Sequence, residues 1–325
     1  MEVSGTSSSR SLCVITGASR GIGKAIVQAL LQSGTNYTVI GSARSASLMS
    51  PSSGRGEDQD FIPVQGDLTQ ASTIAKIREA VGTRTIDLLV HNAGNIEPIR
   101  PCLMPESEGD GQRERTGTDT TGTGSSISTS FRSLFDINFF SAVELMEALG
   151  PCMSPTALVM FMSSAAAGPF VTQGWAGYCA SKAALLQYAR ILALENSFKV
   201  ISFGPGIVDT DMQKRIRETH RRDQEGLEAV PGGREGLPVV TNRNDERQAS
   251  TSTSTKTSTK QDPGFLSFLN SLHASGDMRT VEMVSKSVLA LFQRRNDAEL
   301  RKFFTGEFAD YQDVEPVLFP GTTSS

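Results

Sequence analysis

Tyr178 and Lys182 are four residues apart, so on a helix their side chains lie on one face, a turn from each other. The segment from 178 to about 198 is rich in alanine, leucine, glutamine and arginine, which favour a helix. A phenol beside an ammonium can protonate a carbonyl oxygen during hydride transfer to the carbonyl carbon. The ammonium is expected to lower the phenol's pKa, which is about 10 in water. A tyrosine and a lysine on an ordinary helix surface would show the same spacing, so the pair needs support from elsewhere in the chain.

A glycine-rich segment near the start of the chain could hold a phosphate. It has the pattern Gly17-x-x-x-Gly21-x-Gly23 and lies between an apolar, β-branched run at 12–15 and an apolar stripe with helical spacing. The glycines therefore stand where a strand turns into a helix N-terminus, whose free N–H groups and positive dipole end favour a phosphate. The pattern is looser than Gly-x-Gly-x-x-Gly, and a plain strand-to-helix loop is the alternative.

The end of the second predicted strand, at 37–42, bears on the choice between NAD and NADP. An acidic residue there would bond the ribose 2′-hydroxyl and repel a 2′-phosphate. This chain has Ser42 and Ala43, followed by Arg44, and a further arginine, Arg20, lies in the glycine segment. Two guanidinium groups can neutralise a 2′-phosphate, which favours NADP(H). Two ordinary surface arginines are the alternative.

Further polar segments follow predicted strands or lie in a helical pattern: Asn92-Ala93-Gly94, Asn138, Ser163-Ser164, and Pro205-Gly206 with Thr210. Together with the glycine segment and the Tyr178/Lys182 pair, their order resembles the short-chain dehydrogenase/reductase family over nearly all of the chain outside the low-complexity stretches. The shorter segments 174–179, 208–213 and 306–311 resemble sepiapterin reductase. The segment 92–99 resembles the benzil reductases, which reduce one carbonyl of a vicinal diketone.

The resemblance implies roles for individual residues. Tyr178 would be the general acid, Lys182 would lower its pKa and bind the nicotinamide ribose, and Ser164 would stabilise charge on the carbonyl oxygen. Asn138 would hold a water that passes protons to Lys182. Asp67, after the third strand, would contact adenine. The complete set of implied cofactor-binding residues is Gly17, Ser19, Arg20, Gly21, Ile22, Gly23, Arg44, Asp67, Asn92, Ala93, Gly94, Tyr178, Lys182, Pro205, Gly206, Val208 and Thr210.

Two positions depart from the family pattern. His91 stands at a strand end where the family usually has asparagine. The family spacing would place the catalytic serine at Ala165, so we assign its role to Ser164 and, as a second choice, to Ser163. This assignment implies one extra residue in the loop before Tyr178.

Strands are predicted near 12–16, 37–42, 61–65, 86–91, 157–162, 199–203 and, weakly, 303–305, with helices between them. This alternation specifies an α/β fold, a Rossmann-type doubly wound parallel sheet with helices on both faces. The ligand is expected outside the carboxyl ends of the strands. The expected organisation is one reductase domain over 11–315, with flexible tails at 1–10 and 316–325.

Two stretches, 106–130 and 221–262, are poor in apolar residues and rich in small polar ones. Neither can bury enough surface to offset the entropy of ordering, so both are interpreted as disordered insertions in the single domain. The second falls where the resemblance places the substrate lid. The predicted lid is therefore longer and looser than usual.

Composition excludes several other functions. The net charge is −4, which gives no indication of nucleic acid or an anionic membrane as partner, and no apolar run approaches the length of a membrane span. The four cysteines lack metal-ligand spacing, so no metal site is predicted and a reduced, cytoplasmic protein is expected. A homodimer is implied only by the resemblance, through the helices that carry Asn138 and Tyr178.

The function that the sequence favours is an NADPH-dependent carbonyl reductase acting on small ketones or vicinal dicarbonyls. Trp175 and Met212 are expected at the mouth of the site, where flat apolar surface suits a conjugated ketone. Asp310 aligns with an acid that binds the pterin in sepiapterin reductases, so a pterin side-chain diketone is the alternative substrate. In another functional class, the chain would be a non-catalytic NADP(H)-binding regulator that acts through its insertions.

Overall fold

One parallel sheet of seven strands organises the part of the chain that the computed structural model describes, residues 10–45, 61–99, 127–228 and 263–321. The strand order is β3-β2-β1-β4-β5-β6-β7, so the direction of winding reverses between β1 and β4. The strands are β1 (Ser11–Thr16), β2 (Tyr37–Ala43), β3 (Phe61–Gln65), β4 (Ile86–His91), β5 (Met153–Met162), β6 (Lys199–Gly204) and β7 (Thr305–Asp310). The Rossmann-type fold expected from the sequence is confirmed.

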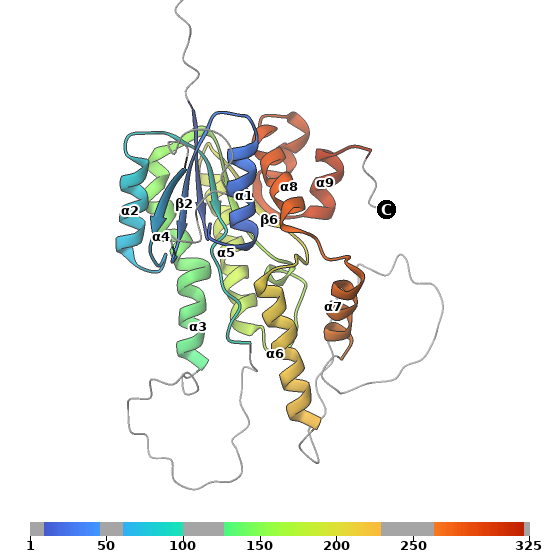
Figure 1. Cartoon of the computed structure of the whole chain (residues 1–325). Helices are drawn as coiled ribbons and strands as arrows, with labels where there is room; N and C mark the ends of the chain where they lie inside the picture. The colour runs from blue at the N-terminus through green and yellow to red at the C-terminus, as the bar shows by residue number, and fades with distance from the viewer. Residues whose placement is uncertain (1–9, 46–60, 100–126, 229–262, 322–325) are drawn as a thin grey trace, which may run out of the picture.

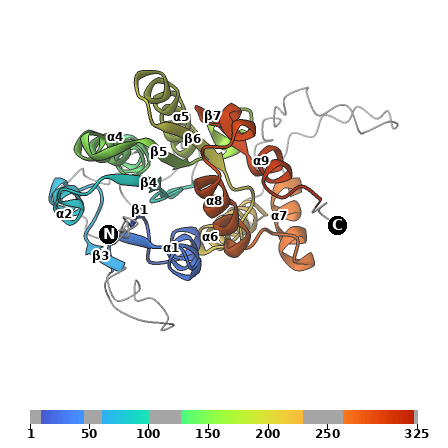
Figure 2. The same cartoon turned by 90° about the horizontal axis from the view of Figure 1, so that it is seen from above.

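Helices cover both faces of the sheet, as Figure 2 shows. One face carries α2 (Ala71–Val81), α4 (Ser141–Leu149) and α5 (Ala176–Glu195), and the other carries α1 (Gly21–Gln32), α8 (Val281–Gln293) and α9 (Tyr311–Leu318). Each face buries its own apolar cluster against the central strands. In β1 the apolar run Leu12 to Ile15 is almost fully buried, as expected for a strand covered on both faces.

Three helices extend past one end of the sheet, beyond the ends of its strands: α3 (Ile127–Phe135), α6 (Asp211–Glu228) and α7 (Pro263–Ser275) (Figure 1). Between α3 and α4 the chain forms a five-residue π-helix, η2 (Asp136–Phe140). The described residues also contain short 3₁₀ turns: η3 (Gly150–Cys152), η4 (Ala165–Ala167) and η6 (Ala298–Phe303). No helix in the described ranges is both long and apolar enough to cross a membrane.

The sequence-based boundaries need corrections near the C-terminus. The last strand is 305–310, not 303–305, because Leu300 and Phe303 are buried in the turn η6, before the strand begins. The tail expected from 316 onward begins later, because α9 continues to Leu318. Val314 and Leu318 of this helix are buried in the core.

The ends of the two predicted insertions also differ. Helix α3 begins at 127 because Leu134 packs into the protein beside α5, so the insertion predicted at 106–130 ends earlier. Helix α6 runs to 228, through good helix formers, so residues 221–228 are helical and not part of a disordered insertion. The remaining parts of both predictions, 106–126 and 229–262, lie outside the described residues. The helix of Tyr178 spans 176–195, close to the expected 178–198.

Candidate active site

A groove of about 960 Å³ runs along the carboxyl ends of the strands, where the fold places ligands. Many predicted cofactor residues line it: Gly17, Ser19, Arg20, Gly21, Ile22, Arg44, Asp67, Asn92, Ala93, Gly94 and Thr210. Of the predicted substrate residues, Met212 lines it too. Gly23, Pro205, Gly206, Val208, Tyr178 and Lys182 do not line the groove itself and are described below.

The glycine segment has a geometry that larger residues could not adopt. Gly17 and Gly21 have φ angles of +67° and +53°. A Cβ on Gly23 would stand 2.3 Å from the Gly17 carbonyl oxygen and 2.6 Å from Asn92 Nδ2. Helix α1 starts at Gly21, and its N-cap residue, Arg20, makes no side-chain capping bond. The first N–H groups of this 12-residue helix therefore face a groove that fits a pyrophosphate.

Two arginines, Arg20 and Arg44, line the groove. Arg20 lies 3.4 Å from Asp211, with both side chains at least half exposed, so this pair is weak and can rearrange around a ligand. Arg44 follows β2, as the sequence predicts, and Asp67 lies near it. Hydrogen bonds from the N–H and hydroxyl of Thr69, together with the charge of Arg44, lower the pKa of Asp67. Asp67 is therefore an ionised acceptor.

Tyr178 lies in the first turns of α5, only 8% exposed. Burial raises its pKa to about 12, and a hydrogen bond with Ser164 acts in the opposite direction. The expectation that Lys182 lowers this pKa is wrong for the structure, because desolvation of the phenolate dominates. The ammonium stands 5.8 Å from the phenol ring centroid. A phenol with this pKa carries its proton at neutral pH.

Lys182 is buried behind the tyrosine. Its Nζ donates a hydrogen bond to the Met162 carbonyl at 2.8 Å, which holds the ammonium at the end of β5. Burial lowers its pKa to about 8. It is therefore mostly charged at pH 7.

The structure distinguishes the two candidate serines. Ser164 is the N-cap of η4, accepts the Ala166 N–H at 3.2 Å, and hydrogen-bonds the Tyr178 phenol. The Ser163 hydroxyl is buried and has no hydrogen-bond partner in the described part of the chain. The geometry therefore brings Ser164, and not Ser163, to the tyrosine.

Asn138 lies in the π-helix and is fully buried. Its amide nitrogen donates to the Asn95 carbonyl at 2.8 Å and to Ser181 Oγ at 3.0 Å, and its oxygen accepts the Asn95 N–H at 2.8 Å. Both N–H groups are thus used by the protein, so the side chain bridges the loop after β4 to α5. A water held for Lys182 would have to donate to the second lone pair of Asn138 Oδ1 or bond the main chain.

The predicted substrate residues fall into two groups. Trp175 is 7% exposed and stands edge-on to Tyr178, with ring centroids 5.6 Å apart. It belongs to an aromatic cluster with Phe170 and Phe265, to which Met212 also contributes. Unlike Met212, neither Trp175 nor Asp310 lines the groove. Asp310 is the N-cap of α9, accepts the Gln312 N–H at 3.0 Å, and its pKa is raised by burial.

The loop after β6 carries Pro205, Gly206 and Val208 and is held by a residue that the sequence analysis missed, Arg279. Its guanidinium donates to the Pro205 carbonyl at 2.7 Å, and its main chain bonds Ile207 and Asp209. Arg279 belongs to none of the motifs named above, and neither do Phe170 and Phe265, so no local signal gave them a role. Asn95 lies in the segment 92–99, but its contact with the distant Asn138 could not be read from that segment.

Comparison with known proteins agrees with this geometry. Residues 11–221 match the family model described as short chain dehydrogenase. An oxidoreductase of Saccharomyces cerevisiae, YIR035C, is 37% identical over 209 residues, which are 63% of this chain and 73% of the relative. Its crystal structure superposes with a TM-score of 0.67 at 26% identity, covering 95% of this chain and 98% of that chain.

Two relatives carry a named activity. A benzil reductase ((S)-benzoin forming) of the same yeast is 34% identical over 216 residues, 63% of this chain and 74% of the relative. Sepiapterin reductase of Bos taurus is 30% identical over 229 residues, 65% of this chain and 77% of the relative.

Proposed function

This chain belongs to the short-chain dehydrogenase family and is an oxidoreductase acting on CH–OH or C=O groups, and from this premise we propose that it is an NADPH-dependent reductase of vicinal diketones. The observation that carries the proposal is the buried contact between Tyr178 and Ser164, with the Lys182 ammonium behind it. As a family member the chain uses a nicotinamide cofactor and a small-molecule substrate.

The proposed mechanism uses the order of these three side chains. A bound nicotinamide cofactor supplies hydride to the carbonyl carbon. Ser164 donates a hydrogen bond to the carbonyl oxygen and stabilises the charge that develops there. Tyr178, protonated because burial raises its pKa to about 12, gives its proton to the alkoxide. The Lys182 ammonium, 5.8 Å from the phenol ring centroid and held by the Met162 carbonyl, lies beside the phenolate that results.

The proposed substrate class rests on the aromatic cluster beside Tyr178 and on the benzil reductase relative. The rings of Trp175 and Phe170, packed edge to face at 63°, offer apolar surface for a conjugated or aromatic ketone. A pterin diketone is the second candidate, favoured by the relative named sepiapterin reductase. Asp310 gives this second candidate little support, because its carboxylate already caps α9.

The function is tested by NADPH consumption with diacetyl, benzil and sepiapterin as substrates. We expect turnover of the diketones. Preference for sepiapterin that is lost in Asp310→Ala would identify the second candidate. NADPH binding without consumption of any substrate would identify the non-catalytic regulator instead.

Cofactor preference is predicted from Arg44 and Arg20. In Arg44→Asp, loss of a charge-assisted hydrogen bond and repulsion of the 2′-phosphate should raise the KM for NADPH at least about tenfold. The new carboxylate should accept the ribose 2′-hydroxyl and lower the KM for NADH. Steady-state kinetics with both cofactors measures this, and Arg301→Asp, an exposed arginine remote from the groove, is the control. Equal use of both cofactors by the wild-type protein would contradict the assignment.

The choice between the serines gives another prediction. Ser164→Ala should lower kcat about 10- to 100-fold, because a donor to the developing charge is lost, whereas Ser163→Ala should leave kcat nearly unchanged. The two variants make the same change at adjacent residues, so each controls for the other. Greater damage from Ser163→Ala would assign the role to Ser163.

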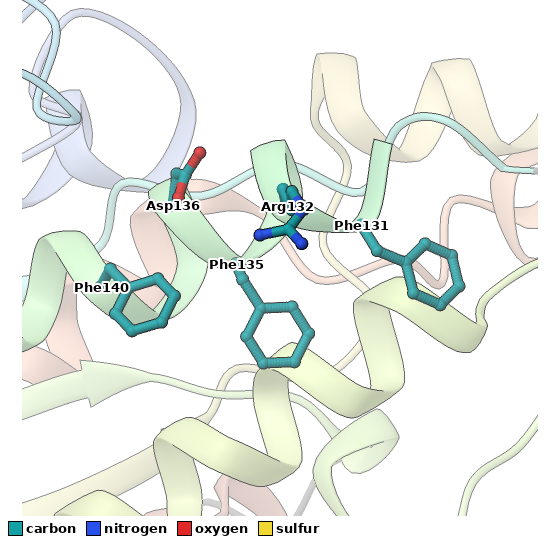
Figure 3. Close-up of a pocket in the computed structure, with 5 residues that line it drawn as sticks. All are labelled: Phe131, Arg132, Phe135, Asp136 and Phe140. Atoms are coloured by element: carbon teal, nitrogen blue, oxygen red, sulfur yellow. The ribbon is translucent and has the colours of Figure 1, made fainter. Parts of the chain in front are cut away.

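A homodimer is also proposed. Phe140, Ile191 and Leu194 are exposed on η2 and α5, with Leu194 82% exposed. Phe140 also lines a surface hollow of about 430 Å³, together with Phe131, Arg132, Phe135 and Asp136, and the three phenyl rings project from one side of α3 and η2 (Figure 3). Covering such apolar surface favours association. Light scattering of the wild type and of Leu194→Asp measures the oligomer.

The cytoplasmic location stays a prediction, which cell fractionation would test.

A further inference from the structure

His91, the residue that departs from the family pattern, is buried at the end of β4 and is only 2% exposed. Its Nε2 lies 3.1 Å from the Ser141 hydroxyl, on the helix that follows the π-helix. The imidazole is neutral, because burial, reinforced by the charge of Lys182, lowers its pKa to about 3. It therefore has a single N–H to donate.

Ser141 makes an unusual pair of bonds at the start of α4. Its backbone N–H donates to the carbonyls of Asp136, five residues back, and Phe139, and not to Ile137, where an α-helix would send it. The Ser141 hydroxyl donates to the Ile137 carbonyl at 2.8 Å and so replaces the displaced N–H. The π-helix is thus closed by a side chain.

These two contacts determine the direction of the hydrogen bonds. The Ser141 hydroxyl has one proton, and it goes to Ile137. With that proton on the Ile137 carbonyl, the hydroxyl accepts from His91 in the tautomer that is protonated on Nε2. The result is a directed relay from the His91 N–H, through the Ser141 hydroxyl, to the Ile137 carbonyl.

The relay ends beside Asn138. Because Asn138 follows Ile137 inside the π-helix, the extra residue in this turn sets where its amide points. That amide joins Asn95 to Ser181, the neighbour of Lys182 in α5. A return to regular α-helix would rotate Asn138 by about 100° and separate these contacts.

We propose that His91 and Ser141 are positioning residues, whose hydrogen-bond relay holds the π-helix and thereby fixes Asn138 between the loop after β4 and the helix of Tyr178 and Lys182. The proposal rests on the proposed reductase function for its kinetic consequences. Its structural part, the relay and the turn that it holds, does not depend on the substrate.

The kinetic test uses four variants: two single substitutions, their combination, and a conservative replacement of His91. Ser141→Ala removes the central hydroxyl, and His91→Phe keeps a flat ring but removes the donor. Each should lower kcat about tenfold and change the KM for NADPH less than about twofold, as expected when only positioning near the reacting atoms is lost. The double variant should lose no more than either single, because the relay acts as a unit. His91→Gln, whose amide nitrogen can take the place of Nε2, should restore most of kcat.

A purely structural role would give a different result. The melting temperature would fall in these variants, but kcat measured well below it would stay at the wild-type value, and that outcome would overturn the proposal. Additive losses in the double variant, or no recovery in His91→Gln, would overturn the relay.

Hydrogen exchange of the cofactor-free protein separates this proposal from the proposed function. In Ser141→Ala, the amides of 138–145 should exchange at least about tenfold faster, while those of α2 stay unchanged as an internal control. Unchanged exchange at 138–145 would overturn the proposal even in an active reductase. Faster exchange in a protein that reduces no diketone would refute the proposed function and leave the relay supported.

Discussion

Replacing Tyr178 by phenylalanine is expected to lower kcat for diketone reduction by at least about 100-fold, with little change in the dissociation constant for NADPH. The phenylalanine keeps the ring that stands edge-on to Trp175 and removes only the hydroxyl that bonds Ser164. The site therefore keeps its shape and loses its proton donor. Stopped-flow kinetics and fluorescence titration of NADPH measure the two quantities separately.

Tyr188→Phe is the matched control, because it makes the same change on the same helix. Tyr188 packs edge-on against Phe139 and Phe161, away from Ser164 and Lys182. We expect nearly wild-type kcat in this variant. Substantial activity in Tyr178→Phe would mean that another group gives the proton.

Arg279→Met is expected to lower the free energy of unfolding by about 3–5 kcal/mol, the usual cost of breaking a buried ion pair by removing one partner. The Arg279 side chain is 6% exposed, pairs with Glu315 of α9, and stacks 3.9 Å from the centre of the Tyr311 ring. Without it, Glu315 keeps the Ser287 hydroxyl, at 2.5 Å, as its hydrogen-bonding partner. Urea unfolding followed by circular dichroism measures the loss.

Arg190→Met tests whether burial causes this cost. Arg190 pairs with Glu307 at 2.6 Å, but the two side chains are 39% and 57% exposed. An exposed pair of this kind contributes at most about 1 kcal/mol. Equal losses in the two variants would contradict the account. Since Arg279 also holds the loop that carries Pro205 and Gly206, the KM for NADPH should rise in Arg279→Met alone.

The parts of the site that the sequence predicted well are those in which one local pattern determines the structure. The apolar run before Gly17 and the helical stripe after Gly23 predict a strand and a helix, so the position of the glycine turn between them follows. The spacing of Tyr178 and Lys182 likewise places both on one face of a helix. These features need no knowledge of distant residues.

Features that depend on distant partners could not be predicted in this way. The pKa of Tyr178 depends on how completely other elements bury it, and spacing to Lys182 carries no information about that. The π-helix at Asn138 makes contact with a hydroxyl three residues later, which in turn meets His91 in another element. Arg279 and Asp310 take their roles from α9, whose formation the sequence analysis did not anticipate.

The most direct test of the central claim is the fate of a labelled hydrogen. The protein would be incubated with benzil and NADPH that carries deuterium at both C4 positions of the nicotinamide, and the benzoin formed would be analysed by mass spectrometry and NMR. A reductase that transfers hydride from NADPH to the carbonyl carbon must place one deuterium on the carbinol carbon and an exchangeable hydrogen on the oxygen. Benzoin without deuterium on that carbon, or no benzoin at all, would contradict the account.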